Sequence, residues 1–174
     1  LDPTDTKAYY ARALAYASLG RYELAIRDYD QAIRLDPQGA DAYYGRGEAY
    51  SSLGQYERAI PDYDEAIRLN PRDAIALNNR GFAYQLLGDN ERAIEDYDEA
   101  TKVDPQLATA FYNRGAAYDS LGQTRQAIDD YDEAIKLDPE HSAAYNNRGL
   151  VYHYLGQYQQ ALKDLDQSIK LEPN

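Results

Sequence analysis

The sequence contains no cysteine, no methionine and no tryptophan, and it has no long hydrophobic run. Without cysteine, disulfide bonds and thiolate metal sites are excluded. No stretch of about 18 apolar residues is present that could form a membrane-spanning helix, and the opening "LDPTDTK" has no signal-peptide pattern. We therefore expect a soluble protein, whose location stays open, with the cytoplasm as the default.

Positive charge is scarce. The chain has 18 Lys and Arg against 30 Asp and Glu, which gives a formal net charge of −12. Nucleic acids and anionic membranes require a concentrated basic surface, so both are excluded as partners. The charge instead favours a protein or peptide partner that is neutral or basic rather than acidic.

Residues for catalysis are equally scarce, because the only histidines are His141 and His153 and neither has a second histidine in its repeat pattern. The acidic run "DDYDE" at 129–133 lacks the turn glycine and the spaced glutamate of a calcium-binding loop. The sequence therefore predicts a protein that is not an enzyme and has no cofactor and no metal site.

What the sequence does contain is a repeat of 34 residues. Six of its seven prolines, at 3, 37, 71, 105, 139 and 173, follow this spacing, and glycines at 20, 54, 88, 122 and 156 follow it too. Counting position 1 at Thr6, we define five repeats: 6–39, 40–73, 74–107, 108–141 and 142–174. Residues 1–5 resemble the tail of a missing preceding repeat. We expect residues 1–174 to form a single array.

Each repeat predicts two helices. Apolar or small residues at positions 4, 8 and 11 share one helical face, and those at positions 20, 24 and 27 share another. Glycine at position 15 favours the end of the first helix, and the Asp-Pro pair or its variant favours the end of the second. Pro61, at position 22, predicts a small kink or a late start in its second helix.

With small residues at 8, 20 and 27, aromatic residues at 4, 11 and 24 and proline at 32, the unit resembles the tetratricopeptide repeat. The resemblance covers almost the whole chain. It implies an all-α, right-handed superhelical solenoid of antiparallel helix pairs. It also implies a concave groove, lined by the first helix of each repeat, that binds a partner segment.

Arginine at position 7 departs from the family, which more often has an apolar residue there. It occurs as Arg12, Arg46, Arg80, Arg114 and Arg148. Aspartates at positions 23 and 25 flank the apolar stripe of every second helix. One hypothesis is that Arg and Asp pair between helices, since an unpaired, partly buried guanidinium is costly. The alternative is a ladder of cations that binds carboxylates of a ligand.

The resemblance places positions 5, 6, 9 and 13 in the groove. Asn79, Asn113 and Asn147 resemble asparagines with which some members of the family hold a peptide backbone. A clamp for an acidic chain terminus is disfavoured, because Lys7 is alone and Asp41, Glu48 and Asp119 are acidic. The candidate ligand-binding residues are Tyr10, Tyr44, Asn78, Asn79, Phe82, Tyr112, Asn113, Asn146, Asn147 and Tyr154.

The sequence thus predicts a protein-interaction scaffold that binds a peptide or partner segment in this groove. The alternative is a structural spacer or self-associating module, natural or engineered, without a dedicated ligand. Leu162, Leu165 and Ile169 are expected to form an apolar stripe with no capping helix over it. From this stripe we expect head-to-tail self-association through the uncapped ends.

Overall fold

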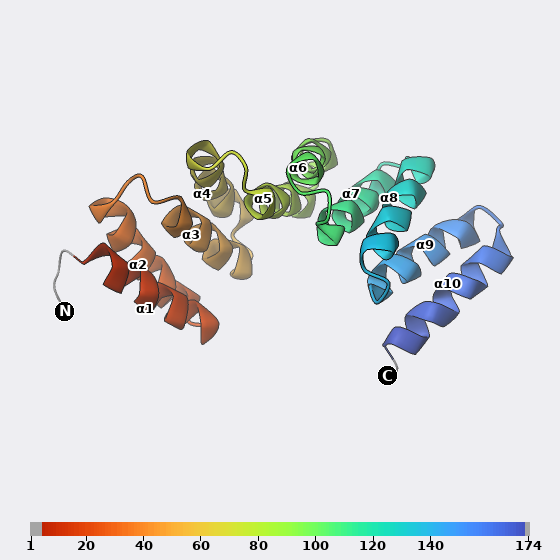
Figure 1. The fold of residues 1–174 in the computed structure, drawn as a ribbon, viewed down its shortest axis with the longest axis horizontal. Coiled ribbons are helices and arrows are strands. Elements are labelled where there is room, and N and C mark those ends of the chain that lie inside the picture. Colours follow the sequence, from red (N-terminus) through yellow and green to blue (C-terminus); the bar gives the residue numbers. More distant parts are fainter. Residues whose placement is uncertain (1–4, 173–174) are drawn as a thin grey trace. The chain divides into compact units, whose positions relative to one another are not determined.

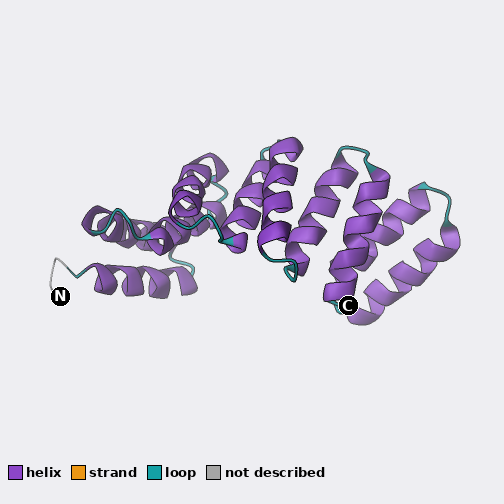
Figure 2. Cartoon of the chain, turned by 45° about the horizontal axis from the view of Figure 1, so that its top comes forward, coloured by secondary structure: helices purple, strands orange, loops and turns teal. Residues whose placement is uncertain are grey.

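The computed structural model describes residues 5–172, and these form ten α-helices and no strand (Figure 1; Figure 2). The helices are α1 (Thr6–Ser18), α2 (Tyr22–Leu35), α3 (Ala40–Ser52), α4 (Tyr56–Leu69), α5 (Ala74–Leu86), α6 (Asn90–Val103), α7 (Ala108–Ser120), α8 (Thr124–Leu137), α9 (Ser142–Tyr154) and α10 (Tyr158–Leu171). Odd-numbered helices are the first helices of the repeats and even-numbered helices the second. The expected tail at 1–5 lies outside the described residues, except for Asp5.

The ends of the first helices follow the glycine signal. Gly20, at the end of α1, has a φ of +69°, a conformation that side chains with a Cβ rarely adopt. The amide of Arg21 donates to the carbonyl of Tyr16, and the amide of Gly20 donates to the carbonyl of Ala17. This pair of bonds is a Schellman motif, which satisfies carbonyls that the helix itself leaves unbonded.

The chain divides into two compact units, residues 1–88 with α1 to α5 and residues 89–174 with α6 to α10. In the first unit, α1 packs on α2 and α3 on α4, while α2 packs on α3 and α4 on α5. In the second unit, α7 packs on α8 and α9 on α10, while α6 packs on α7 and α8 on α9. Within each unit, antiparallel hairpins therefore stack through the second helix of one and the first helix of the next. The expectation of one array over residues 1–174 stays a prediction.

The core of each hairpin is made of alanine and tyrosine. Tyr29, Tyr63, Tyr97 and Tyr131, all at position 24, are almost fully buried, as are the alanines at position 20. Glycine on the first helix lets the tyrosine ring approach, since a Cβ on Gly47 would lie 2.9 Å from Cε1 of Tyr63. The small residues thus allow close helix packing around a large ring.

Three of the arginines at position 7, Arg46, Arg114 and Arg148, each join three helices. In the first unit, Arg46 on α3 donates to Asp62 on α4 at 2.8 Å and 2.5 Å and to Asp30 on α2 at 2.6 Å. In the second unit, Arg148 on α9 binds Asp164 on α10 and Asp132 on α8 in the same way. The predicted pairing between helices is therefore confirmed, and these arginines are part of the framework.

The buried aspartates of these pairs remain costly to ionise. Burial raises the pKa of Asp62 and Asp130, and hydrogen bonds from Arg46 and Arg114 oppose that rise. Because each guanidinium binds its buried aspartate through two parallel hydrogen bonds, the pairing fixes geometry as well as charge.

Pro61 lies inside α4 and is exposed. The expected late start is wrong, because α4 begins at Tyr56, the position at which α2 and α10 also begin. A proline at the sixth residue of a helix removes one backbone donor, and its ring crowds the preceding turn. The packing of α4 on α3 and α5 holds the helix together in spite of this defect.

The apolar stripe expected on α10 is confirmed in part. Leu162 and Ile169 are 57% and 67% exposed. Leu165 instead lies partly buried beneath Gly149, where a Cβ would come within 3.0 Å of its Cγ. It occupies the place that tyrosine fills in the other repeats, so it belongs to the interior of its own hairpin.

Candidate functional site

The ten candidate residues all lie on first helices, five in each unit. In the first unit they are Tyr10 on α1, Tyr44 on α3, and Asn78, Asn79 and Phe82 on α5. In the second unit they are Tyr112 and Asn113 on α7, and Asn146, Asn147 and Tyr154 on α9.

Hydrogen bonds connect the candidate residues of neighbouring repeats in the first unit. Nδ2 of Asn79 donates to the hydroxyl of Tyr44 at 3.1 Å and to Oε1 of Glu48 at 3.3 Å. Oδ1 of Asn79 accepts a hydrogen bond from Nδ2 of Asn78 at 3.1 Å. Both ends of the Asn79 amide are therefore engaged within the protein.

The second unit repeats the arrangement. Nδ2 of Asn147 donates to the hydroxyl of Tyr112 at 3.2 Å, and Oδ1 of Asn147 accepts from Asn146 at 3.3 Å. The ring of Tyr112 also lies 4.6 Å from that of His141, measured between centroids. An asparagine at position 6 thus anchors the tyrosine of the preceding repeat, and a peptide would have to exchange that bond.

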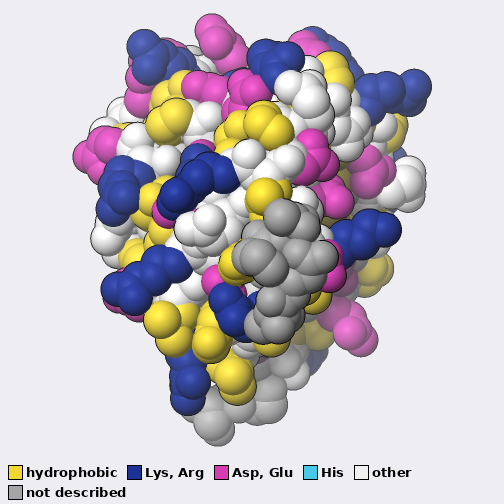
Figure 3. All heavy atoms as spheres, turned by 90° about the vertical axis from the view of Figure 1, so that its left-hand side faces the viewer, with side chains coloured by type: hydrophobic (Ala, Val, Ile, Leu, Met, Phe, Trp, Pro, Cys, Tyr) yellow, Lys and Arg dark blue, Asp and Glu magenta, His cyan; other side chains and the backbone are white. Residues whose placement is uncertain are grey.

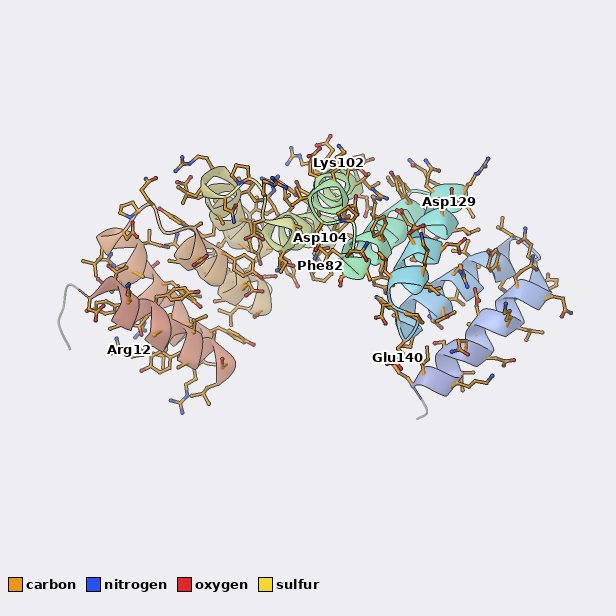
Figure 4. All side chains as sticks on the ribbon, in the orientation of Figure 1. Arg12, Phe82, Lys102, Asp104, Asp129 and Glu140 are labelled. Carbon is orange, nitrogen blue, oxygen red and sulfur yellow. The ribbon has the colours of Figure 1, made fainter. Side chains whose placement is uncertain are left out.

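The candidate residues differ in how much surface they present. Asn78 and Asn113 are buried, whereas Phe82 (Figure 4) is 41% exposed and Tyr154 is 84% exposed. Tyr10 is partly buried, with its ring 6.0 Å from that of Tyr29. Phe82 and Tyr154 are thus the exposed candidates, and both are aromatic. Asn79 and Asn147 are partly buried, as are the tyrosines that they bond.

Carboxylates lie close to the candidate tyrosines of the first unit. Burial, Asp41 and then Glu48 raise the pKa of Tyr10, and burial followed by a hydrogen bond to Glu48 raises the pKa of Tyr44. Burial, with smaller contributions from Tyr10 and Glu48, raises the pKa of Tyr29 to about 12. These tyrosines are neutral at physiological pH, and the charge near them is that of the carboxylates.

Sequence reasoning missed a hollow beside these tyrosines. It has a volume of about 270 Å³ and lies between α1, α2 and α3, where Leu14, Tyr29, Gly45 and Glu48 line it. Gly45 could have indicated it, since later repeats have asparagine at the same position. A larger hollow of about 510 Å³, beside Arg148 and Asp164, is lined by none of the ten candidate residues.

The two histidines have structural partners. Nδ1 of His141 accepts the amide of Ala144 at 3.3 Å and caps α9, while the ring of His153 lies beside those of Tyr154 and Tyr158. Residues 5–172 contain no group of three or more His, Asp or Glu side chains placed to hold a metal ion. Within the same residues, no helix is both long and apolar enough to cross a membrane.

Sequence models of the tetratricopeptide repeat match residues 40–73, 108–141 and 142–174, and a second model of that repeat matches residues 62–95. A third model, of the TPR repeat, matches residues 13–54 and 86–122. A search of curated proteins gave no match.

Solved structures resemble the chain over almost its whole length. MamA is 26% identical, with 91% of this chain and 93% of that chain covered and a TM-score of 0.85. YrrB, described as a TPR protein with an unusual peptide-binding site, is 25% identical, with 99% and 89% covered and a TM-score of 0.80. PilF of Pseudomonas aeruginosa, 21% identical with 97% and 77% covered and a TM-score of 0.88, shows the fold alone. The predicted fold class, an all-α solenoid of antiparallel helix pairs, is confirmed.

Proposed function

The chain belongs to the tetratricopeptide repeat family of protein-interaction scaffolds, and we propose that it binds an extended peptide segment along the surface of its first helices. Proteins of this family are typically modules without enzymatic activity. The net charge of −12 makes a neutral or basic peptide the favoured partner.

The observation that carries the proposal is that aromatic side chains are exposed on first helices of both units, beside tyrosine–asparagine pairs on the same set of helices. Phe82 and Tyr154 offer apolar contact area, and the Tyr44–Asn79 and Tyr112–Asn147 pairs are held in place by hydrogen bonds. Aromatic anchors that are already ordered lose little entropy on binding. The similarity to YrrB, which is described as having a peptide-binding site, agrees with this use of the surface.

The asparagines can bind a peptide only if they give up a hydrogen bond within the protein and form one to the peptide instead. When an extended chain approaches Asn79, its backbone carbonyl can replace the Tyr44 hydroxyl as acceptor, because one amide hydrogen bond is substituted for another. The tyrosine hydroxyl released in this way can donate to the peptide instead. Binding therefore needs a local rearrangement of side chains but no movement of the helices.

The test is capture of peptides from a random display library on the immobilised full chain. We expect Phe82→Ala to lower capture about tenfold, because an exposed aromatic anchor is lost. Leu35→Ala on α2 is the matched control, since Leu35 is 40% exposed but lies on a second helix. An empty capture, or equal losses in both variants, would favour the spacer alternative.

Self-association is a second candidate, because two exposed faces resemble those that are buried between stacked hairpins. Ala15 on α1 is exposed, whereas its counterparts Ala49, Ala83 and Ala117 are at most 1% exposed. Leu162 and Ile169 are the exposed apolar residues of α10. On the side drawn in Figure 3, hydrophobic side chains reach the surface among charged ones.

The charges on the two exposed faces are complementary, which favours a second copy of the chain as the partner that covers them. Within residues 5–172, Arg12 (Figure 4) binds only Asp28 of its own hairpin, whereas Arg46 also binds Asp30 of the preceding repeat. Asp166, the counterpart of Asp30, is exposed and forms no ion pair within that range. In this candidate, Arg12 of one copy pairs with Asp166 of the next, and the contact is head-to-tail.

Sedimentation at increasing protein concentration tests this candidate. Asp166→Lys should weaken association about tenfold, because it places a cation opposite Arg12. Glu95→Lys, on the exposed surface of α6, changes the net charge equally and should have little effect. A wild-type chain that stays monomeric at the highest concentration would rule self-association out.

A further inference from the structure

The hollow, or recess, between α1, α2 and α3 lies beside Gly45, at position 6 of the second repeat. A Cβ on Gly45 would lie 2.5 Å from Cζ of Tyr29, so any other residue would have to displace that ring. Asn79, Asn113 and Asn147 occupy the same position in the later repeats. Where α5, α7 and α9 carry an amide, α3 therefore has a glycine against which the ring of Tyr29 packs.

One wall of the recess carries a carboxylate held in place by its neighbours. Glu48 accepts a hydrogen bond from Asn79 at 3.3 Å, and its hydrogen bond to Tyr44 contributes to the raised pKa of that tyrosine. Some acids of this unit are paired with cations, since Asp30 and Asp62 bind Arg46 and Glu65 binds Arg68. Glu48 forms no ion pair with any residue that the structure describes.

The remaining walls are apolar and aromatic. Leu14 and Ala17 of α1 line one side, and Tyr29 forms the floor beside Gly45. Such a site suits a side chain with an aliphatic stem and a cationic end, because the stem packs on apolar groups and the cation meets the carboxylate of Glu48.

We propose that this recess receives a lysine or arginine side chain of the bound peptide, with its stem against Leu14 and Ala17 and its charge at Glu48. The inference rests on the proposed function, since the peptide backbone has to be held on the first helices. It adds a definite chemistry to the partner, which is a peptide with a cation at the position that meets α1 and α3. A pre-positioned carboxylate strengthens such a charge-assisted hydrogen bond.

A double-mutant cycle tests the proposal with peptides selected from the random library by the full chain. In one arm, the lysine or arginine of a selected peptide is changed to glutamine. In the other arm, the protein carries Glu48→Gln, which keeps the size of the side chain and its ability to accept from Asn79. We expect each change alone to weaken binding about tenfold and the two together hardly more than either, because both remove the same contact.

The matched control is Glu95→Gln, which removes the same charge from an exposed site on α6. With this variant, the cationic peptide should bind as it does to the wild type. If selected peptides bind but show no enrichment in lysine or arginine, or if Glu48 and Glu95 couple to the cation equally, the recess proposal is wrong and the proposed function stands. If no peptide is selected, or if Phe82→Ala leaves selected peptides unaffected, both proposals are wrong.

Discussion

At the residue scale, arginine and asparagine recur in the same repeat but differed in how far their roles could be predicted. The arginine pairs were predictable, because both partners recur in every repeat and lie at the edges of predicted apolar stripes. Asn79 was assigned to a ligand, whereas it bonds Tyr44, a residue 35 positions earlier. That partner depends on how one hairpin stacks on the next, which the pattern of a single repeat does not contain.

Removal of Arg46 should be among the most destabilising surface changes. Arg46→Ala leaves the buried carboxylate of Asp62 without its partner and also cuts the link to α2, so we expect a loss of about 3 kcal/mol in the free energy of unfolding. Arg12→Ala, where the side chain is 42% exposed and binds one aspartate, should cost clearly less. Urea unfolding followed by circular dichroism measures both, and equal losses would contradict the three-helix role.

At the scale of the helix, the boundaries were predictable because the residues that begin and end each helix recur in all five repeats. Glycine ends α1, α3, α5, α7 and α9 with positive φ, as expected. Pro61 was the exception, since a local rule predicts a small kink or a late start, and the late start does not occur because α4 begins at Tyr56. Pro61 lowers the stability of α4, and the second helices of the other repeats have no proline at this position.

Replacement of Pro61 should therefore stabilise the protein. Pro61→Glu restores the missing amide donor and relieves the ring contact, and position 22 already carries glutamate at Glu95. We expect a gain of about 2 kcal/mol, after allowance for the greater freedom of the unfolded chain. The reverse change, Glu95→Pro, should destabilise by about 3 kcal/mol. Unchanged urea midpoints in both variants would show that the proline carries no such cost.

At the scale of the whole molecule, buried tyrosines make stability depend on alkaline pH. Burial raises the pKa of Tyr29 to about 12 and also raises those of Tyr63, Tyr97 and Tyr131, against about 10 in an unfolded chain. Above that value the unfolded state loses protons that the folded state keeps. Stability should be intact below about pH 10 and fall by ~1.4 kcal/mol per pH unit for each such tyrosine.

Unfolding by urea at a series of alkaline pH values measures this slope, and tyrosinate absorbance reports the ionisation. Tyr29→Phe should reduce the slope of unfolding free energy against pH by the contribution of one tyrosine, ~1.4 kcal/mol per pH unit. A midpoint that stays constant from neutral pH to about pH 12 would contradict the assignment of these rings to the core.

The fold was predictable because five copies of the same pattern predict the same two helices. The recess at Gly45 was not predictable in this way. It lies between three helices of two successive repeats, and its lining depends on how those helices pack around Tyr29 and Gly45. Likewise, Leu165 was expected at the surface but fills the space of a tyrosine beneath Gly149. A residue that departs from the repeat can be identified in the sequence, but its contacts become known only from how the helices pack.

The account depends most on peptide binding along the first helices, and nuclear magnetic resonance of the full chain with a selected peptide tests this directly. The side-chain amide signals of Asn79 and Asn147 should shift as the peptide is added, since their bonds to Tyr44 and Tyr112 are exchanged. Shifts confined to second helices, with both amide signals unmoved at saturation, would contradict it.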